Sequence, residues 1–233
     1  MGEKTAIVTA AGHGIGAAVA RELAGTGYRV SLLSNAGGAL DLAQELGGIG
    51  MNGSVAEPSD LEKLVRTTLE TYGRVDAVVN NTGHPPKGEL LDIPDDDWHL
   101  GLELLILNVV RMARLVTPVF LEQGGGAIVN ISTFSAFEPE LSFPVSSTLR
   151  AGLASFTKLY ADRYAGAGIR INNVLPGYMD NYPSSEANLA KIPLNRYARV
   201  GEVAQTVRFL LSDEAGYITG QNLRVDGGLT RSI

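Results

Sequence analysis

Three polar side chains in the second half of the chain have types and spacings that suit chemistry: Thr133, Ser146 and Arg150. Thr133 follows an apolar run, and Ser146 and Arg150 are four residues apart, which puts both on one helix face. A hydroxyl can polarise an oxygen, and a guanidinium can bind ribose hydroxyls, but a guanidinium stays charged and does not relay protons. The three residues predict a binding and polarising site without an obvious acid.

A glycine-rich turn between the first strand and the first helix predicts a nucleotide site. It reads Thr9-Ala10-Ala-Gly12-His13-Gly14-Ile15-Gly16. Glycines permit a tight turn and let a pyrophosphate approach the backbone. The amides and dipole at the start of the helix favour the phosphate charge. An ordinary glycine-rich turn is the alternative interpretation.

The elements that must hold these residues alternate along the chain. Short β-branched runs predict strands at 5–9, 29–33, 75–79, 127–131, 169–175 and 222–225. Periodic segments predict helices at 14–24, 39–46, 60–72 with its cap at Ser59 or Asp60, 95–121, 144–165 and 200–211. Such alternation implies right-handed crossovers and helices on both faces of a parallel sheet. We therefore expect an α/β protein, one doubly wound domain over residues 1–233.

Composition excludes several classes of function. The net charge is −6 and no basic run is present, which disfavours nucleic-acid and anionic-membrane binding. The chain has no cysteine, and His13, His84 and His99 are too scattered to predict a metal site. Because no signal peptide or span of about 18 apolar residues is visible, we expect a cytoplasmic protein outside the membrane.

At these motifs the chain resembles the short-chain dehydrogenases/reductases, with a FabG-like overall pattern. Residues 9–16 resemble the cofactor turn of that family, with Ala10 in place of its first glycine, a mild change if φ there is negative. Asn80-Asn81-Thr82-Gly83 and Pro176-Gly177 resemble its N-N-A-G and P-G motifs, and 217–228 resembles its closing Y-I-T-G-Q and V-D-G-G segment. The resemblance implies a single-domain Rossmann fold of about seven strands, with a substrate lid at 179–197.

The resemblance also implies that the chain binds a nicotinamide dinucleotide. NAD-preferring members place an acidic residue at the end of the second strand, where this chain has Ser34 and Asn35. His13 stands where NADP-dependent members often carry a basic residue, and Ser54 replaces the usual adenine-contacting aspartate. We expect NADP(H) more than NAD(H), with a site that holds neither tightly as the alternative. The implied cofactor-binding residues are Thr9, Gly12, His13, Gly14, Ile15, Gly16, Ser34, Asn35, Ser54, Val55, Asn81, Thr82, Gly83, Arg150, Pro176, Gly177 and Met179.

The catalytic residues of this family are replaced. In the family a tyrosine protonates the substrate oxygen, a lysine lowers the tyrosine pKa and binds ribose, a serine polarises the carbonyl, and an asparagine completes a relay. Alignment by flanking residues puts Ser146, Arg150, Thr133 and Leu105 at those four positions. Asn108, three residues after Leu105, substitutes for the asparagine only if its helix is shifted or rotated. Loss of the general acid typically lowers the rate by ~10²–10⁴.

Other residues near these motifs are candidates for the missing acid. His84 follows the N-N-T-G motif and Tyr178 follows Pro176-Gly177. Their plainer interpretations are a polar loop residue and a packing residue beside the cofactor. Residues expected at the substrate cleft, with solvated charges or core packing as the alternative, are Glu138, Glu140, Phe134, Phe137 and Phe143.

Three functions remain open. The first is an oxidoreductase with altered proton delivery, acting on a small carbonyl, alcohol or imine substrate. The second is a non-catalytic relative that binds a dinucleotide or supports an active paralogue in a mixed oligomer. The third is a redox-neutral lyase or isomerase that uses the same cleft. Because the family pairs through its two long helices, we also expect a homodimer or homotetramer.

Overall fold

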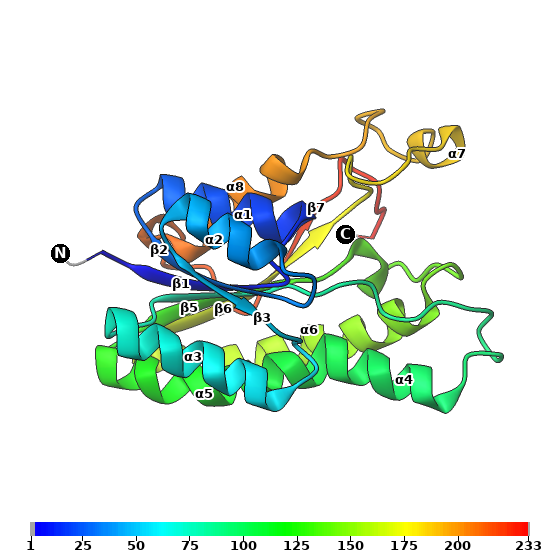
Figure 1. Cartoon of the computed structure of the whole chain (residues 1–233). Coiled ribbons are helices and arrows are strands. Elements are labelled where there is room, and N and C mark those ends of the chain that lie inside the picture. The colour runs from blue at the N-terminus through cyan, green and yellow to red at the C-terminus, as the bar shows by residue number, and fades with distance from the viewer. Residues whose placement is uncertain (1–2, 233) are drawn as a thin grey trace.

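Seven parallel strands form one sheet in the order β3-β2-β1-β4-β5-β6-β7 in the computed structural model, which describes residues 3–232 (Figure 1). The strands are β1 (Thr5–Thr9), β2 (Arg29–Ser34), β3 (Ile49–Asn52), β4 (Ala77–Asn80), β5 (Gly126–Ile131), β6 (Ile169–Pro176) and β7 (Asn222–Val225). The helices are α1 (Gly14–Gly25), α2 (Gly38–Leu46), α3 (Pro58–Tyr72), α4 (Asp95–Leu102), α5 (Asn108–Gln123), α6 (Pro144–Tyr164), α7 (Glu186–Leu189) and α8 (Val200–Leu211). The predicted doubly wound α/β fold is confirmed.

Helices cover both faces of the sheet and bury two apolar layers. Helices α1, α2 and α8 lie on one face, and α3, α5 and α6 lie on the other (Figure 1). The first layer includes Val19 and Val207 against Val8 of the sheet, and the second includes Leu64 and Met112 against Val78, with all six side chains fully buried. Successive residues of β1 and β4 therefore feed opposite layers, as expected for a sheet buried on both faces.

Three elements show the main differences from the sequence prediction. Strand β3 was not predicted, because Ile-Gly-Met-Asn offers no β-branched run and Gly50 lets the backbone of α2 approach closely. Helix α3 begins at Pro58 with Glu57 as its N-cap, rather than at Ser59 or Asp60, because proline suits the first helical turn. Strand β4 begins two residues later than predicted, since the side chain of Gln123 bonds the backbone of Val75.

The long helix predicted at 95–121 is interrupted by a π turn. Residues Glu103–Leu107 between α4 and α5 have π geometry, which rotates the residues that follow relative to a regular α-helix. The segment Asp95–Gln123 is long and apolar enough to cross a membrane by length and composition. In this fold it packs against α3, α6 and β5, so its apolar residues serve the packing of a folded domain.

A ladder of asparagines crosses four strands, from the last residue of β4 to the first residue of β7. Asn80, Asn130, Asn173 and Asn222 are paired in register across β4, β5, β6 and β7. Amide donors link each to the next at 2.9, 2.9 and 2.7 Å, and Thr157 of α6 joins Asn130 and Asn173. Because amides aligned in this way satisfy one another only in one register, the ladder fixes how the strand ends line up.

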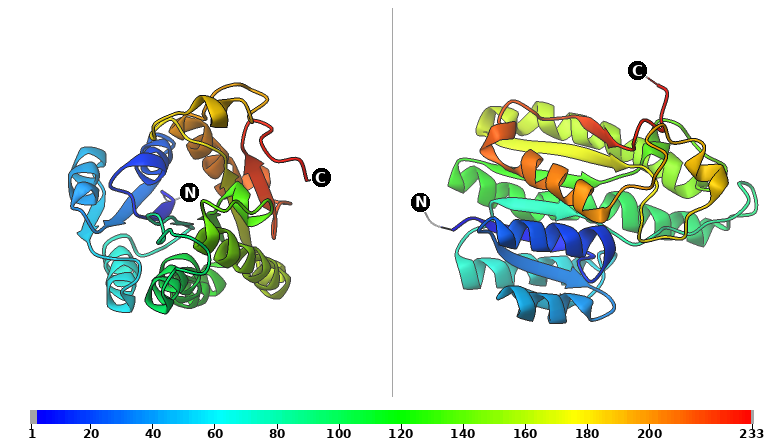
Figure 2. Two further views of the ribbon diagram at one scale, coloured as in Figure 1. Left: turned by 90° about the vertical axis from the view of Figure 1, so that its right-hand side faces the viewer. Right: turned by 90° about the horizontal axis from the view of Figure 1, so that it is seen from above.

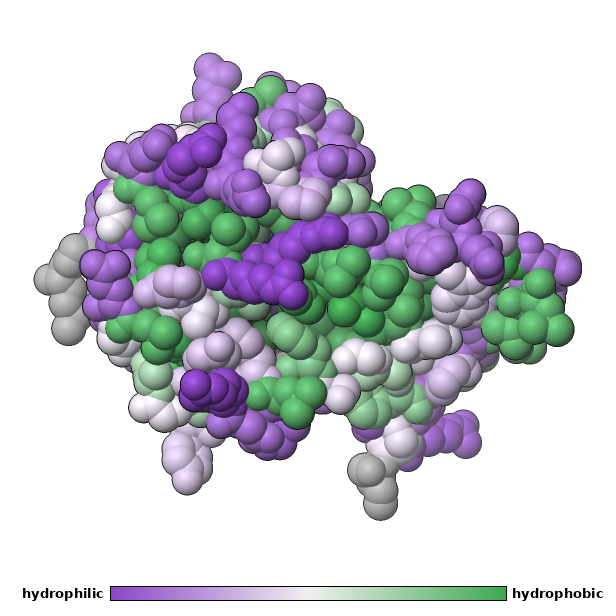
Figure 3. All heavy atoms as spheres, turned by 90° about the horizontal axis from the view of Figure 1, so that it is seen from below, coloured by the Kyte–Doolittle hydropathy of each residue, from purple (hydrophilic) through white to green (hydrophobic). Residues whose placement is uncertain are grey.

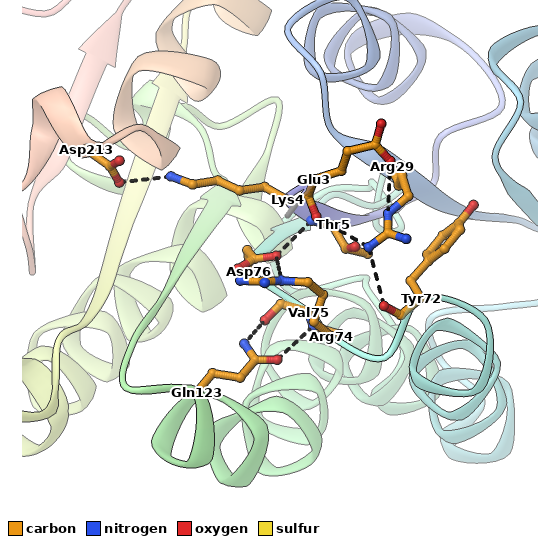
Figure 4. A network of polar contacts seen from close by, with 10 residues as sticks. All are labelled: Glu3, Lys4, Thr5, Arg29, Tyr72, Arg74, Val75, Asp76, Gln123 and Asp213. Atoms are coloured by element: carbon orange, nitrogen blue, oxygen red, sulfur yellow. Dashed lines mark hydrogen bonds and ion pairs between the residues drawn. The ribbon is translucent and has the colours of Figure 1, made fainter. Parts of the chain in front are cut away.

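The opposite edge of the sheet is tied by charged side chains (Figure 4). Asp76 accepts hydrogen bonds from the Thr5 amide and from Arg74, each at 2.8 Å. Lys4 forms an ion pair of 2.9 Å with Asp213, and Arg29 lies over the ring of Tyr72. These contacts join the start of β1 to the segments before β4 and after α8, and the start of β2 to the end of α3, at the amino ends of the strands.

The asparagine ladder should contribute most at its centre. Asn130→Ala leaves the amides of Asn80 and Asn173 short of partners, so we expect the free energy of unfolding to fall by about 2–4 kcal/mol. Asn222→Ala, at the partly exposed end, should lower it by only about 1 kcal/mol. Urea unfolding followed by circular dichroism measures both variants, and equal losses would contradict a cooperative ladder.

Candidate active site

A cavity of about 830 Å³ opens at the carboxyl ends of the strands, the edge that faces the viewer in the left view of Figure 2. It extends from the turn after β1 to the start of α6, beneath the predicted lid at 179–197. Ligands bind at this edge in doubly wound folds, and the volume suits a cofactor-sized molecule. Among residues 3–232 there is no cluster of three metal-ligating side chains.

The turn from β1 into α1 is tightly built. Gly14 has φ +55°, and a Cβ on Gly16 would lie 2.3 Å from the Ala10 carbonyl oxygen, so only glycine fits there. Ala10 itself has φ +45°, so the negative φ that would make alanine a mild change at this position is not present. The close approach of α1 to the Ala10 carbonyl holds this alanine in the left-handed region, where a side chain is strained.

Two of the predicted cofactor residues lie behind the cavity wall. Gly16 is buried where α1 meets the turn, and Thr9 is buried in β1. The Thr9 hydroxyl donates to the Asn81 carbonyl at 2.7 Å and accepts from the Asn81 amide at 2.9 Å. Neither residue lines the cavity, and both instead position residues that do.

The far end of the cavity has polar groups but no carboxylate. Ser34 and Asn35, after β2, line it together with Ser54 and Val55, after β3. The Ser34 hydroxyl accepts from the Ala39 amide at 3.0 Å, and the Ser54 hydroxyl accepts from the Ala56 amide at 3.1 Å. Each hydroxyl therefore stabilises the turn that contains it. No acidic residue among 3–232 lines this end, although the Asp60 carboxylate accepts from the Ser54 amide at 2.8 Å behind it.

The middle of the cavity fits a nicotinamide dinucleotide. Buried polar atoms without a protein partner are the Thr82 hydroxyl and the Arg150 Nε, and both residues line the cavity. Such atoms are costly unless a ligand or water satisfies them. A ligand with hydroxyl and carbonyl groups, like that nucleotide, would supply partners. The other predicted cofactor residues that line the cavity are Gly12, His13, Gly14, Ile15, Asn81, Gly83, Pro176, Gly177 and Met179.

The predicted trio meets at the inner end of the cavity. Thr133 follows β5 and caps the short helical turn 134–136 by accepting from the Ser135 amide at 3.4 Å. Ser146 and Arg150 line the same wall from α6. Arg150 donates to the Ile131 carbonyl, and burial lowers its pKa to about 10, so it remains charged at neutral pH.

The preceding long helix offers this cavity no polar side chain. Asn108, the proposed substitute for the family asparagine, is buried outside the cavity, and its side-chain oxygen accepts from the Val109 amide at 2.6 Å. Leu105 is also buried outside it, and Leu104 lines the wall instead. Asn108 was a substitute only if its helix were shifted or rotated. A π turn does precede it, but its side chain lies outside the cavity.

His84 and Tyr182 meet across the mouth of the cavity. His84 Nε2 and the Tyr182 hydroxyl are 2.8 Å apart, and their rings contact edge to face at 5.2 Å. Desolvation, together with the charges of Lys87 and Arg150, lowers the pKa of His84, so its imidazole is neutral at pH 7. A phenol hydrogen-bonded to a neutral imidazole is a group that can give up and regain a proton. Sequence reasoning missed Tyr182, because nothing in the lid pairs it with His84.

Tyr178 is poorly suited to act as an acid. Its hydroxyl donates to Glu140 at 3.1 Å, and its ring packs against Tyr197 and Phe134 at 5.4 and 5.5 Å. Burial and the Glu140 carboxylate raise its pKa well above the ordinary value. Tyr178 is therefore a packing residue, and its raised pKa makes it a weak acid.

The remaining residues expected at the cleft divide between the cavity and its surroundings. Phe134 and Phe143 line the cavity, whereas Phe137 is exposed beside Arg224. Glu138 accepts from the amides of Arg231 and Ser232 in the C-terminal segment, and neither Glu138 nor Glu140 lines the cavity. Both carboxylates thus anchor protein segments.

The lid is anchored to the rest of the domain. Residues Ile192 and Tyr197 are buried with Phe134 and Leu229, and Met179 pairs with Ala198 in a β-bridge. Tyr182, Pro183 and Asn188 line the cavity from this segment. The lid therefore has an ordered packing of its own while forming one wall of the site. The division of the chain into one domain with a lid at 179–197 stays a prediction.

Fold and cavity together define a nucleotide-binding α/β protein with its site at the carboxyl edge of the sheet. A family model described as enoyl-(acyl carrier protein) reductase matches residues 9–230. The chain is 35% identical to the 3-oxoacyl-[acyl-carrier-protein] reductase of Synechocystis sp. over 97% of this chain and 96% of that protein. It is 31% identical to the enzyme of the same name from Salmonella typhimurium, over 97% of both chains.

Two solved structures share the fold throughout. The 3-ketoacyl-(acyl-carrier-protein) reductase of Brucella melitensis, complexed with NADH, superposes with a TM-score of 0.93 at 25% identity, over 98% of both chains. The L-sorbose reductase of Gluconobacter frateurii, complexed with NADPH and L-sorbose, gives 0.90 at 27% identity, over 100% of this chain and 98% of that one. The chain belongs to the short-chain dehydrogenase/reductase family of NAD(P)-dependent oxidoreductases, with a FabG-like pattern.

The strained alanine in the nucleotide turn makes a stability prediction. Ala10→Gly relieves the left-handed strain but gives the unfolded chain more freedom, so we expect a net gain of up to about 1 kcal/mol in the free energy of unfolding. The matched control is Ala11→Gly, which removes a fully buried methyl and should lower that free energy by about 1 kcal/mol. Denaturant unfolding compares them, and a loss at Ala10 would contradict the strain.

Proposed function

We propose that this protein is an NADP(H)-dependent reductase that acts on a small carbonyl or imine substrate through an altered proton-delivery system. The observation that carries the proposal is one continuous cavity, which joins the glycine turn to Thr133, Ser146 and Arg150. A dinucleotide laid along it from Ser34 to Arg150 would bring its nicotinamide to the inner end. The relatives named above reduce 3-oxoacyl groups, so a 3-oxoacyl thioester is one carbonyl substrate to test.

The residues of this chain would divide the work of such a reduction. When bound, the reduced nicotinamide supplies a hydride to the carbonyl carbon. The Thr133 hydroxyl donates to the carbonyl oxygen and polarises it, and Arg150 holds positive charge beside it. Ser146 fills the position of the family tyrosine, but an aliphatic hydroxyl is too weak an acid for that role.

The proton comes from the pair that spans the cavity mouth. Tyr182 gives its phenolic proton to the developing alkoxide, and the hydroxyl product then leaves with that proton. His84, hydrogen-bonded to the same phenol, orients it, and solvent water returns a proton to the tyrosinate. This proposal is supported by the 2.8 Å contact and by the position of both rings on the cavity wall.

A dinucleotide-binding protein without turnover is the second candidate function. It is favoured by the exchange of all four catalytic positions and by the apolar wall that Leu104 presents where the family has a polar relay. A redox-neutral lyase or isomerase is a third possibility for the same cavity. Product formation without change in nicotinamide absorbance would identify it.

We also propose that the protein pairs through helices α5 and α6. Apolar residues gather on the face of the molecule that α3, α5 and α6 cover (Figure 3). Leu121 of α5 and Leu159 of α6 are 49% and 66% exposed there, which exceeds what a solvated helix face needs. A homodimer or homotetramer would cover them, whereas a monomeric mass by light scattering would contradict the proposal. Mixed assembly with a paralogue and a cytoplasmic location stay predictions.

Nucleotide preference follows from the end of β2. Calorimetric titration should give tighter binding of NADPH than of NADH, because no carboxylate lies near Ser34. Ser34→Asp brings a negative charge to the 2′-phosphate and should weaken NADPH binding by at least about tenfold, while NADH binding is retained. Ser34→Ala is the control for the lost hydroxyl. If none of the four nicotinamide nucleotides binds, the protein does not use this cofactor.

The proton donor is tested by removing one oxygen atom. Tyr182→Phe keeps the ring but loses the phenol, so kcat should fall by ~10²–10⁴ with little change in nucleotide affinity. Tyr197→Phe is the matched control on the same lid. If both variants retain full activity, Tyr182 is not the donor.

The same pair predicts a pH dependence. Since desolvation and nearby cations lower the pKa of His84 from 6.5, the imidazole is neutral at pH 7 and accepts from Tyr182. Protonation at lower pH removes that acceptor, so kcat/KM should decline as the pH falls below 6.5, and His84→Gln should abolish this acidic limb. If the decline of kcat/KM at low pH persists in His84→Gln, another group causes it.

A further inference from the structure

The charged residues that line the cavity all carry positive charge. They are Lys87 and Arg150, accompanied by the imidazoles of His13 and His84. The chain has 25 acidic and 19 basic residues, yet no aspartate or glutamate among residues 3–232 lines the cavity. An acidic protein has thus kept its cavity free of carboxylates, which makes the field inside attractive to anions.

Arg150 is the buried member of this set. Only 7% of its surface is exposed, and its one protein hydrogen bond goes to the Ile131 carbonyl. Its Nε has no partner, and no carboxylate within residues 3–232 forms an ion pair with it. A buried charge without a counter-ion is unfavourable, and removal of that penalty is a source of affinity for an anion.

Lys87 places further positive charge at the same end, beside the neutral imidazole of His84. The Lys87 ammonium lies 4.9 Å from the centre of the Phe143 ring, just before the start of α6. Lys87 and Arg150 are both near enough to His84 to depress its protonation. Arg150 therefore lies with Ser146 at the inner end of the cavity, and Lys87 and His84 lie toward its mouth.

The dinucleotide does not account for this charge. Its pyrophosphate would lie at the turn Gly12–Gly16, where backbone amides and the α1 dipole receive it. The part that would reach Arg150, by resemblance to the family, is the nicotinamide ribose, whose hydroxyls are neutral. An uncompensated guanidinium and a lysine remain for the substrate.

We propose that the substrate carries a carboxylate, which Arg150 and Lys87 bind at the inner end of the cavity. The proposal rests on the reductase function above and deepens it by naming the charge of the substrate. A guanidinium presents two parallel N–H donors that match a carboxylate, and Lys87 adds a point charge from the rim. The carbonyl to be reduced would lie between this carboxylate and the Tyr182 hydroxyl.

Paired substrates test the proposal. We would measure kcat/KM with NADPH for 2-, 3- and 4-oxopentanoate, for their methyl esters, and for an acetoacetyl thioester. At least one oxo acid should exceed its own ester by about tenfold or more, the effect expected for a close charge pair. Lys87→Met should remove most of that preference for the acid over its own ester. Lys63→Met, on exposed α3, is the matched control and should alter neither.

A binding measurement supplies a second readout that needs no turnover. Pentanoate should bind the protein saturated with NADP⁺ more tightly than pentanamide does, and Lys87→Met should bring the two affinities together. A preference for the neutral esters, the thioester or the amide would overturn the proposal. If nucleotide binds and neutral carbonyls are reduced without any preference for acids, only this inference fails. If no nucleotide binds and no carbonyl is reduced, the reductase function itself fails.

Discussion

The asparagine ladder through Asn80, Asn130, Asn173 and Asn222 is the constraint on which the site depends. Parallel strands can slide past one another, but buried amides that must satisfy each other allow one register only. The residues just beyond the ladder form the cavity: Asn81 after β4, Thr133 after β5 and Gly177 after β6. The site therefore depends first on the alignment of the strand ends. That alignment does not involve the residues at the catalytic positions of the family.

That independence would let a family site survive the exchange of proton-transfer residues that we propose. Thr133 and Arg150 keep a hydroxyl and a cation at positions that the sheet and α6 define. The acid need not come from α6, because the loop after β4 and the lid bring His84 and Tyr182 together over the same cavity. The buried charge of Arg150 then becomes a property that the substrate can use, rather than a means of lowering a tyrosine pKa.

The sequence was most informative where local rules decide the structure. Alternating strands and helices, the glycine turn and the cavity walls at Ser34, Thr133 and Arg150 follow from spacing and resemblance. The misses depend on tertiary contacts. Strand β3 forms by pairing with β2, Ala10 is held at φ +45° by the approach of α1, and the π turn excludes Asn108 from the cavity. The contact of His84 with Tyr182 joins loops 98 residues apart, beyond the reach of any local pattern.

The central claim is that hydride transfer persists in a site that has lost the tyrosine and lysine of its family. Single-turnover reaction with NADPH deuterated at the transferable position of the nicotinamide, followed by mass spectrometry of the organic product, tests it directly. The account predicts that deuterium appears at the former carbonyl carbon of the alcohol. Tight nucleotide binding with no deuterium in any product of the oxo-acid, ester, thioester and imine panel would contradict it.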